Sequence, residues 1–329
     1  QWGAGLEWDS PLGLGDQLML RGGHDAISDH QKTSKNTMLY YNVPWGWWNF
    51  SYTYSESDYR TYGVTDGFKY RQDGDNQNHQ LRAERVIHRD DVSKTSVNVG
   101  LAHLRTNNYI LDARTEASSN RLSELQLGVN HGRRIGSAFV NLDLGMQSGI
   151  GLLDAQSQDE RDPLGRRQPN SRYRKYTATV SYLQPFTLWG ESLSFSSLAT
   201  GQRSEDVLYA PQRMSLGGSY SVRGFKDQQL NGDSGGYWRN EVRWARPVTL
   251  DWMRPAFAEY GASVGYDQGV IRNDRYNDNV HGRVSSNSLE LFARGKHVST
   301  SVTFAHSLER PGVVSEREAP IYFRMDLFL

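Results

Sequence analysis

The sequence predicts an all-β fold, a transmembrane antiparallel β-barrel, on two main observations. Apolar and polar residues alternate along many segments, as where Leu125, Leu127 and Val129 alternate with polar residues or glycine. A period of two places every second side chain on the same face of a strand. The second observation is that no run of 18 or more apolar residues occurs, so a membrane-spanning helix is excluded. Barrel strands need no such run, because lipid-facing apolar residues alternate with lumen-facing polar ones.

Composition narrows the class further. Lys plus Arg and Asp plus Glu both number 37, and this zero net charge argues against nucleic-acid binding. The chain has no cysteine, which excludes disulfides and thiolate sites; we expect neither a cofactor nor a metal. The 18 Tyr, 11 Phe and 9 Trp argue against disorder. Residues 1–6 already have a strand pattern, so we expect a secretion signal to lie upstream of this chain or to have been removed.

Fifteen strands can be read from the alternation. They are expected at residues 2–9, 16–24, 35–43, 46–57, 77–88, 94–105, 120–132, 136–147, 172–184, 191–202, 236–246, 255–266, 287–295, 297–307 and 320–329. The first and last of fifteen antiparallel strands run the same way and cannot pair as antiparallel neighbours. Because single-chain bacterial barrels have even strand numbers, we expect one more strand before Gln1, sixteen in all. The whole chain, 1–329, is then one barrel domain with a periplasmic C-terminus.

The connections support the same topology. Tight turns alternate with long polar segments, as expected for short periplasmic turns and longer external loops. The long segments are 25–34, 58–76, 106–119, 148–171, 203–235, 267–286 and 308–319. Seven tryptophans lie in or near the tight turns, where they would form an aromatic girdle at the periplasmic interface: Trp8, Trp45, Trp47, Trp48, Trp189, Trp244 and Trp252.

The candidate functional motif lies in the longest connection. Val222-Arg223-Gly224-Phe225 follows a Gly-rich approach from Met214. With the segments Asp9–Leu18, Tyr41–Gly46 and Asp91–Ser96, this motif makes essentially the whole chain resemble the TpsB outer-membrane transporters of two-partner secretion. That family includes the haemolysin, filamentous-haemagglutinin and contact-dependent-inhibition transporters, within the superfamily of the barrel-assembly protein BamA.

The resemblance implies a sixteen-stranded barrel whose Val-Arg-Gly-Phe loop folds back into the lumen. Its arginine would meet an acidic residue of the wall in a Phe-x-Asp-x-Gly motif. The matching segment is Phe257 to Gly261, with Glu259 in place of Asp. We therefore expect Arg223 to pair with Glu259, because a guanidinium presents a planar fork of donors to a carboxylate. Full-length members also carry an N-terminal plug helix and two POTRA domains, which this sequence does not contain.

The function implied by the resemblance is export of a large unfolded exoprotein of the TpsA type, such as a haemolysin, an adhesin or a contact-dependent-inhibition toxin. Other expected partners are outer-membrane lipid, lipopolysaccharide and, during biogenesis, the barrel-assembly machinery. The protein is expected to be a monomer that binds no nucleic acid. No nucleotide-binding GxxxxGK[ST] motif occurs, in keeping with a membrane that faces no ATP.

Two other functions would fit a barrel of this kind. A passive or solute-selective porin can also have sixteen strands, but a porin has no reason to carry Ser-Val-Arg-Gly-Phe. An outer-membrane enzyme would need a Ser/His or Asp/His group at the rim. His24 beside Asp25, and His88 near Asp90, are candidates by adjacency alone, so we expect rim or turn residues and no catalytic activity.

Overall fold

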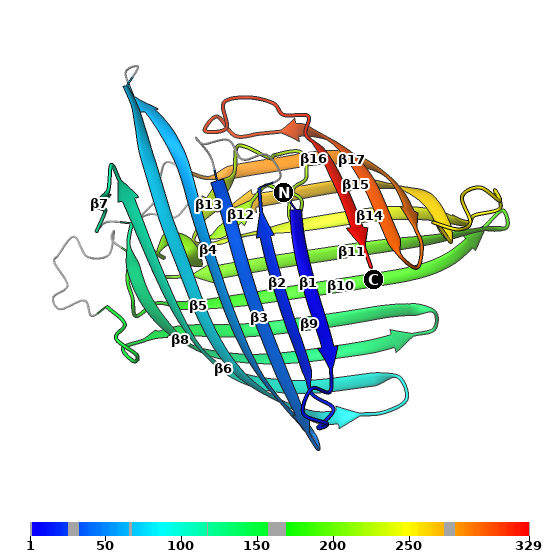
Figure 1. Cartoon of the computed structure of the whole chain (residues 1–329), viewed down its shortest axis with the longest axis horizontal. Coiled ribbons are helices and arrows are strands. Elements are labelled where there is room, and N and C mark those ends of the chain that lie inside the picture. The colour runs from blue at the N-terminus through cyan, green and yellow to red at the C-terminus, as the bar shows by residue number, and fades with distance from the viewer. Residues whose placement is uncertain are drawn as a thin grey trace.

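A single antiparallel sheet curls into a barrel (Figure 1). The structure, a computed structural model, describes residues 2–25, 33–65, 68–116, 118–156, 169–272 and 280–328. The sheet has 16 strands, fifteen in sequence order and the short β7 beside β6. Its strands are β1 Trp2–Asp9, β2 Gln17–His24, β3 Thr33–Trp45, β4 Trp48–Thr65, β5 Phe68–Arg89, β6 Ser93–Ile110, β7 Ala113–Arg114, β8 Asn120–Ile135, β9 Ala138–Ile150, β10 Arg174–Leu188, β11 Glu191–Ser204, β14 Gly235–Pro247, β15 Glu259–Ile271, β16 Gly282–Arg294, β17 Val298–Glu309 and β18 Ile321–Leu327.

The tight connections fix the register of neighbouring strands. Between β10 and β11, Leu188 pairs with Glu191, so the turn consists of Trp189 and Gly190 alone. Both have positive φ, 53° and 80°. A two-residue hairpin turn with positive φ at both central positions matches the right-handed twist of the strands it joins.

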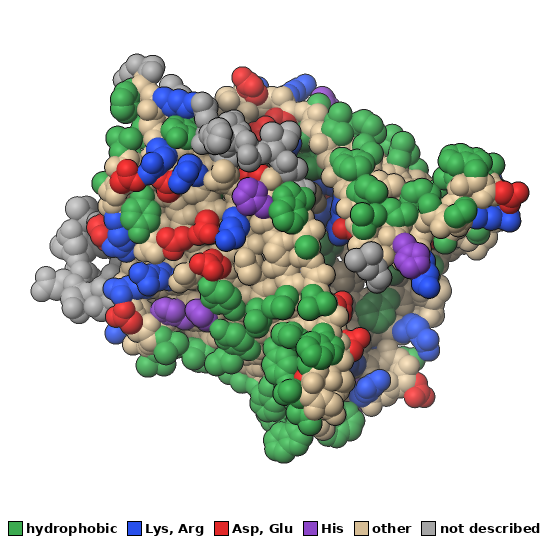
Figure 2. Space-filling view, viewed as in Figure 1, with side chains coloured by type: hydrophobic (Ala, Val, Ile, Leu, Met, Phe, Trp, Pro, Cys, Tyr) green, Lys and Arg blue, Asp and Glu red, His purple; other side chains and the backbone are tan. Residues whose placement is uncertain are grey.

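The two faces of the sheet differ as the alternation predicts. On β8, Leu125, Leu127 and Val129 are exposed on the outer face, whereas Glu124 and Gln126 line the lumen. Figure 2 shows hydrophobic side chains gathered over the lower and right parts of the surface. Acidic and basic side chains gather at the upper left, where β4 and β5 project. Apolar side chains facing outward on so many strands suit a lipid environment.

Five of the seven tryptophans are exposed in or beside the connections that the sequence predicts to be tight turns. Trp189, Trp252 and Trp45 are strongly exposed, at 92%, 78% and 73%. Trp189 and Trp45 lie in or beside tight turns, and Trp252 lies in the longer connection from β14 to β15. Trp8 and Trp47 are also exposed at tight turns. An indole with an apolar body and a polar N–H is suited to a membrane–water interface.

All fifteen predicted strands are confirmed, but the predicted loop at 58–76 is wrong. There β4 runs to Thr65 and β5 begins at Phe68, and the two remain paired throughout. Among the described residues this hairpin extends beyond its neighbour β3, which pairs with β4 as far as Arg60. Polar residues on both faces concealed the strand pattern. The predicted connection at 267–286 is also too long, because β15 continues to Ile271 and β16 begins at Gly282. The predicted connections at 25–34, 148–171 and 267–286 include 26–32, 157–168 and 273–279, which lie outside the described residues, as do Gln1 and Leu329.

The first and last strands run the same way along the barrel (Figure 1). Within the described residues no pairing joins β1 to β18. A sixteenth long strand before Gln1 stays a prediction. No helix in the described part of the chain is long and apolar enough to span a membrane.

Candidate functional site: a loop anchored in the lumen

The connection from β11 to β14, residues 205–234, folds into the barrel, and we call it the lumen loop. It contains the 3-10 turn η1 Ala210–Gln212 and a small hairpin, β12 Met214–Leu216 paired with β13 Leu230–Gly232. The Val222–Phe225 motif lies at the turn end of this hairpin, where both Val222 and Phe225 are buried.

An apolar cluster seats the lumen loop on the wall. Phe225 is only 1% exposed. The loop contributes Met214, Leu216, Val222, Phe225 and Leu230 to the cluster, and the structure around it contributes Ile271 of β15, Val284 of β16 and Val314 of the β17–β18 connection. Full burial of a phenylalanine stabilises by about 1.5–3 kcal/mol, so this residue contributes strongly to loop docking.

Arg223 is the polar centre of the seat. Its Nε lies 2.8 Å from Oδ2 of Asp267 on β15, and its Nη2 lies 2.7 Å from Oδ1 of the same carboxylate. The backbone N–H of Arg223 also donates to Oδ2, at 3.1 Å. Nη1 donates to Glu241 of β14 at 2.8 Å, and the Tyr322 hydroxyl of β18 donates to the Arg223 carbonyl at 2.9 Å. Three wall strands therefore hold one residue of the loop.

The charges around Arg223 balance. The Arg223 side chain is 6% exposed and that of Asp267 is 0% exposed. A second guanidinium, Arg239 of β14, lies 3.7 Å from Asp267 and donates to the carbonyls of Ser219 and Tyr220 at the loop tip. With Glu241, two arginines face two carboxylates. A buried charge is costly when unpaired, so each member depends on the others.

Three glycines allow the loop to approach the wall so closely. A Cβ at Gly265 would lie 2.2 Å from Nη2 of Arg223. One at Gly269 would lie 2.9 Å from a methyl group of Leu216, and one at Gly224 would lie 2.4 Å from Cβ of Ser286. Real Cβ atoms do not approach heavy atoms this closely, so both surfaces need glycine here.

The predicted pairing of Arg223 with Glu259 is wrong. Glu259 faces the lumen but binds Nη2 of Arg243, at 2.9 Å. It lies eight residues before Asp267 on the same strand, about 27 Å away at 3.4 Å per residue. Phe257 lies in the turn before β15, and Gly261 packs closely against the backbone of β14.

A signal in the sequence could have identified the true partner. Asp267 lies between Gly265 and Gly269, and all three face the same side of β15. The segment Gly265–Gly269 keeps the aspartate and the last glycine of the expected Phe-x-Asp-x-Gly motif, with glycine in the place of phenylalanine. An acid flanked on one face by glycines marks a flat patch of wall that another chain segment can reach.

A second polar anchor lies on β10 and β8, on the other side of β11 from the Arg223 seat. Lys175 of β10 donates to the side-chain and backbone oxygens of Gln212, at 2.5 and 3.3 Å. Its ammonium also lies 3.9 Å from Glu124 of β8, which accepts a short hydrogen bond from Tyr173. The lumen loop is thus held by wall strands on both sides of β11.

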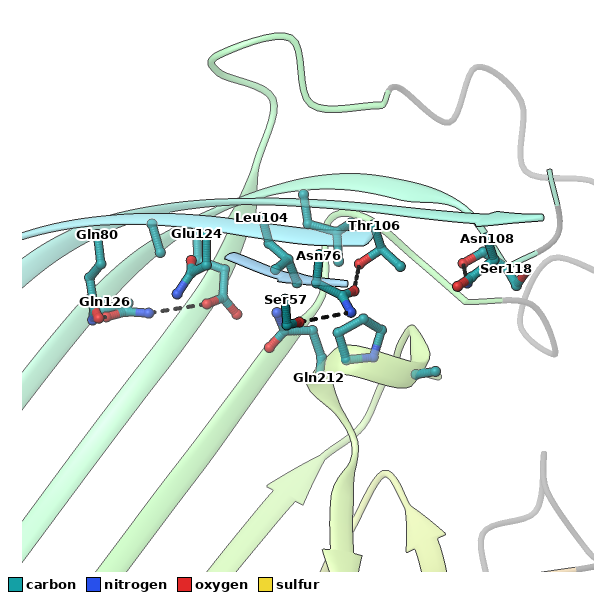
Figure 3. Close-up of a pocket in the computed structure, with 15 residues that line it drawn as sticks. Ser57, Asn76, Gln80, Leu104, Thr106, Asn108, Ser118, Glu124, Gln126 and Gln212 are labelled. Carbon is teal, nitrogen blue, oxygen red and sulfur yellow. Dashed lines mark hydrogen bonds between the residues drawn. The ribbon is translucent and has the colours of Figure 1, made fainter. Parts of the chain in front are cut away.

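A polar cavity of about 590 Å³ separates the loop from strands β4, β5, β6 and β8. Figure 3 shows wall side chains such as Asn76, Gln80 and Gln126 on one side and Gln212 of the loop on the other. The wall groups hydrogen-bond one another, with Gln80 donating to Gln126 at 2.7 Å and Thr106 to Asn76 at 2.8 Å. The surface is therefore rich in amides and hydroxyls, with little charge.

The candidate enzymatic pairs are rim and turn residues. His88 lies 3.1 Å from Asp90, but that carboxylate accepts the backbone N–H groups of Val92 and Ser93 and so closes the β5–β6 turn. These hydrogen bonds hold the pKa of Asp90 well below its usual range. His24 contacts only the carbonyl of Asp25 among its described partners. The described residues contain no cluster of three or more metal-ligating side chains.

The fold and this site define a class: a β-barrel whose lumen holds an inward-folded loop anchored by a buried arginine. The family model for the haemolysin secretion/activation proteins ShlB/FhaC/HecB matches residues 1–292. The chain belongs to this family, which confirms the resemblance inferred from the sequence.

Individual relatives agree with that assignment. The chain is 27% identical over 328 residues to the outer membrane transporter CdiB of Dickeya dadantii, covering 99% of this chain and 57% of the relative. It is 30% identical over 322 residues to CdiB of Escherichia coli O6:K15:H31, covering 97% of this chain and 53% of the relative. The hemolysin transporter protein HpmB of Proteus mirabilis is 28% identical over 71% of this chain and 41% of its own length. The chain thus spans about half the length of these relatives.

Solved structures show the same architecture. CdiB from Escherichia coli superimposes with a TM-score of 0.89 at 29% identity, covering 99% of this chain and 59% of that one. BamA from Haemophilus ducreyi, at 13% identity and a TM-score of 0.61, covers 99% of this chain and 67% of its own, and shares the fold.

Proposed function

We propose that this barrel is the export pore of an outer-membrane transporter of two-partner secretion. A large unfolded exoprotein of the TpsA type, such as a haemolysin, an adhesin or a contact-dependent-inhibition toxin, would pass through it to the cell surface. Family membership supports this proposal, and so do the names of relatives, which are transporters of the outer membrane. The observation that carries it is the seat of Arg223 on Asp267 and Glu241, which keeps a polypeptide loop inside the lumen.

The chemistry of the lumen suits a polypeptide passenger. One wall is covered by the lumen loop, and the wall opposite carries amide and hydroxyl side chains such as Asn78 and Gln126. These groups both donate and accept hydrogen bonds, as peptide groups do, so they accept an unfolded chain of any sequence. The loop is held by polar contacts at its two anchors and by the apolar cluster around Phe225.

The remaining assignments follow from this proposal. The chain forms a single barrel domain in the outer membrane, with its C-terminus and tight turns at the periplasmic end and the long connections outside. Lipid and lipopolysaccharide surround the exposed apolar face, and the barrel-assembly machinery inserts the protein. We propose a monomer, in which that face contacts lipid alone.

Secretion by living cells tests the proposal. Cells lacking the protein are complemented with the wild type or with Arg223→Ala, and the co-encoded exoprotein is measured in the medium. We expect secretion with the wild type and a strong reduction with Arg223→Ala at equal amounts of folded barrel. Selective solute uptake without exoprotein secretion would instead identify a solute-selective porin.

A further inference from the structure

The backbone of the segment after the motif, Lys226–Gln228, is bound by a carboxylate that lies outside the Arg223 ion pair. The carboxylate of Glu318, in the connection from β17 to β18, accepts three consecutive backbone N–H groups. Oε2 accepts from Lys226 at 2.6 Å and from Asp227 at 3.0 Å, and Oε1 accepts from Gln228 at 2.9 Å. A carboxylate that accepts several backbone N–H bonds forms strong, charge-assisted contacts. These bonds outweigh the effect of burial and hold the pKa of Glu318 below its ordinary value.

The contact is reciprocal. The side-chain oxygen of Gln228 accepts from the backbone N–H and hydroxyl of Ser315, at 2.8 and 3.1 Å. Val314, from the same connection, packs in the apolar cluster with Phe225. The lumen loop and the β17–β18 connection therefore bind each other through side chains from both.

Glu318 is itself fixed to the wall. Its backbone N–H donates to the hydroxyl of Ser307 at 2.8 Å, and its carbonyl accepts from the N–H and the hydroxyl of Ser307 at 2.9 and 3.0 Å. Ser307 is completely buried on β17. Four residues further along, Tyr322 binds the carbonyl of Arg223. The hydrogen bonds with Ser307 of β17 thus hold Glu318 beside the motif.

We propose that Glu318 is a positioning residue of the lumen loop, which holds the segment after Phe225 so that Arg223 stays on Asp267. The seat then has two halves, an ion-pair half on β14 and β15 and a carboxylate half on the β17–β18 connection. The loop leaves its seat only when both halves release. This inference rests on the proposed function only where it predicts secretion; the positioning itself is independent of any cargo.

Hydrogen exchange on the purified protein in detergent tests the positioning. Glu318→Gln keeps the size of the side chain but places an amide NH₂ against N–H donors. We expect the amides of residues 226–228 to exchange at least about tenfold faster than in the wild type, because hydrogen bonds to a charged acceptor are lost. The exposed carboxylate of Glu316 provides the matched control, and Glu316→Gln should leave these rates unchanged. Unchanged exchange in Glu318→Gln overturns the proposal.

Two further variants keep the test decisive. If Glu318→Gln does not fold, Gln228→Ala removes the reciprocal contact from the loop side and should raise exchange in residues 314–316; unchanged rates there count against the two-part seat. Secretion is then compared for Arg223→Ala, Glu318→Gln and the double variant. If Glu318 acts through Arg223, the double variant is no worse than Arg223→Ala, whereas additive losses contradict this. Faster exchange with normal secretion by all three would support the positioning and refute the proposed function of the loop.

Discussion

Arg223 and Asp267 form a bidentate ion pair inside the barrel, with Nε–Oδ2 and Nη2–Oδ1 distances of 2.8 and 2.7 Å. Asp267 is completely buried, and it also accepts the backbone N–H of Arg223. The pair joins the lumen loop to a wall strand 44 residues further along the chain.

The first prediction concerns the loss of this pair. Asp267→Asn keeps the shape of the side chain but leaves the Arg223 guanidinium with only Glu241 and a neutral amide. Removing one partner of a buried ion pair costs about 3–5 kcal/mol, so the loop should undock while the barrel stays folded. We expect faster amide exchange in residues 214–232. The shift in electrophoretic mobility on heating, which reports a folded barrel, should be unchanged. Retained protection would show that Asp267 does not hold the loop.

The second prediction tests the close approach at Gly265. An added Cβ would lie 2.2 Å from Nη2 of Arg223, so Gly265→Ala should displace the guanidinium and reduce secretion as much as Arg223→Ala does. Gly201→Ala is the control, because the nearest atom to its Cβ is 3.8 Å away. Secretion assays of the two alanine variants, normalised to folded barrel, check this. Equal secretion by both would contradict the packing account.

The third prediction concerns the apolar cluster around Phe225. Phe225→Ala leaves a cavity beside Ile271 and Val284, and such truncations cost about 3–5 kcal/mol. The loop should therefore become sensitive to added protease while the strands stay protected. Tyr220→Ala, at a position that is 84% exposed, should have no such effect. A resistant loop in Phe225→Ala would rule out the cluster as its anchor.

The fourth prediction is a pH dependence that arises at Glu318. Its pKa in the folded protein lies below the ordinary value of 4.5, so its stabilising contribution is fully present above that value. The contribution is lost as pH falls further, through the folded pKa. Loop protection should therefore be constant from pH 8 to pH 5 and should decrease only below about 4.5. The charged neighbours Lys226 and Asp227 contribute to this region, so Glu318→Gln is compared over the same range and should show a flatter profile.

The sequence predicted the strands well because period two is a local property. Each residue on β8 or β16 shows its face through its own side chain and its neighbours two positions away. The hairpin of β4 and β5 was predicted too short, since its end is polar on both faces.

The wall partner of Arg223 was missed for a different reason. Alternation shows that Glu259 faces the lumen, but the predicted strand ended at residue 266, so Asp267 was assigned to a connection although β15 continues to Ile271. Alternation also cannot say how far along β15 the loop descends. That depth depends on the length of the lumen loop and on its contacts with Tyr322 and Glu318, which lie about a hundred residues away in sequence. The motif residues Val222–Phe225 were recognisable, whereas their seat is a tertiary property.

The most direct test of the central claim is secretion of the co-encoded exoprotein by cells carrying Asp267→Asn or Glu259→Gln. Both variants remove one lumen-facing carboxylate from the same strand. Loss of secretion by Asp267→Asn and near-normal secretion by Glu259→Gln, at equal amounts of folded barrel, is the predicted result. Normal secretion by Asp267→Asn, or an equal loss in both variants, would contradict a pore that works through an Arg223 loop seated on Asp267.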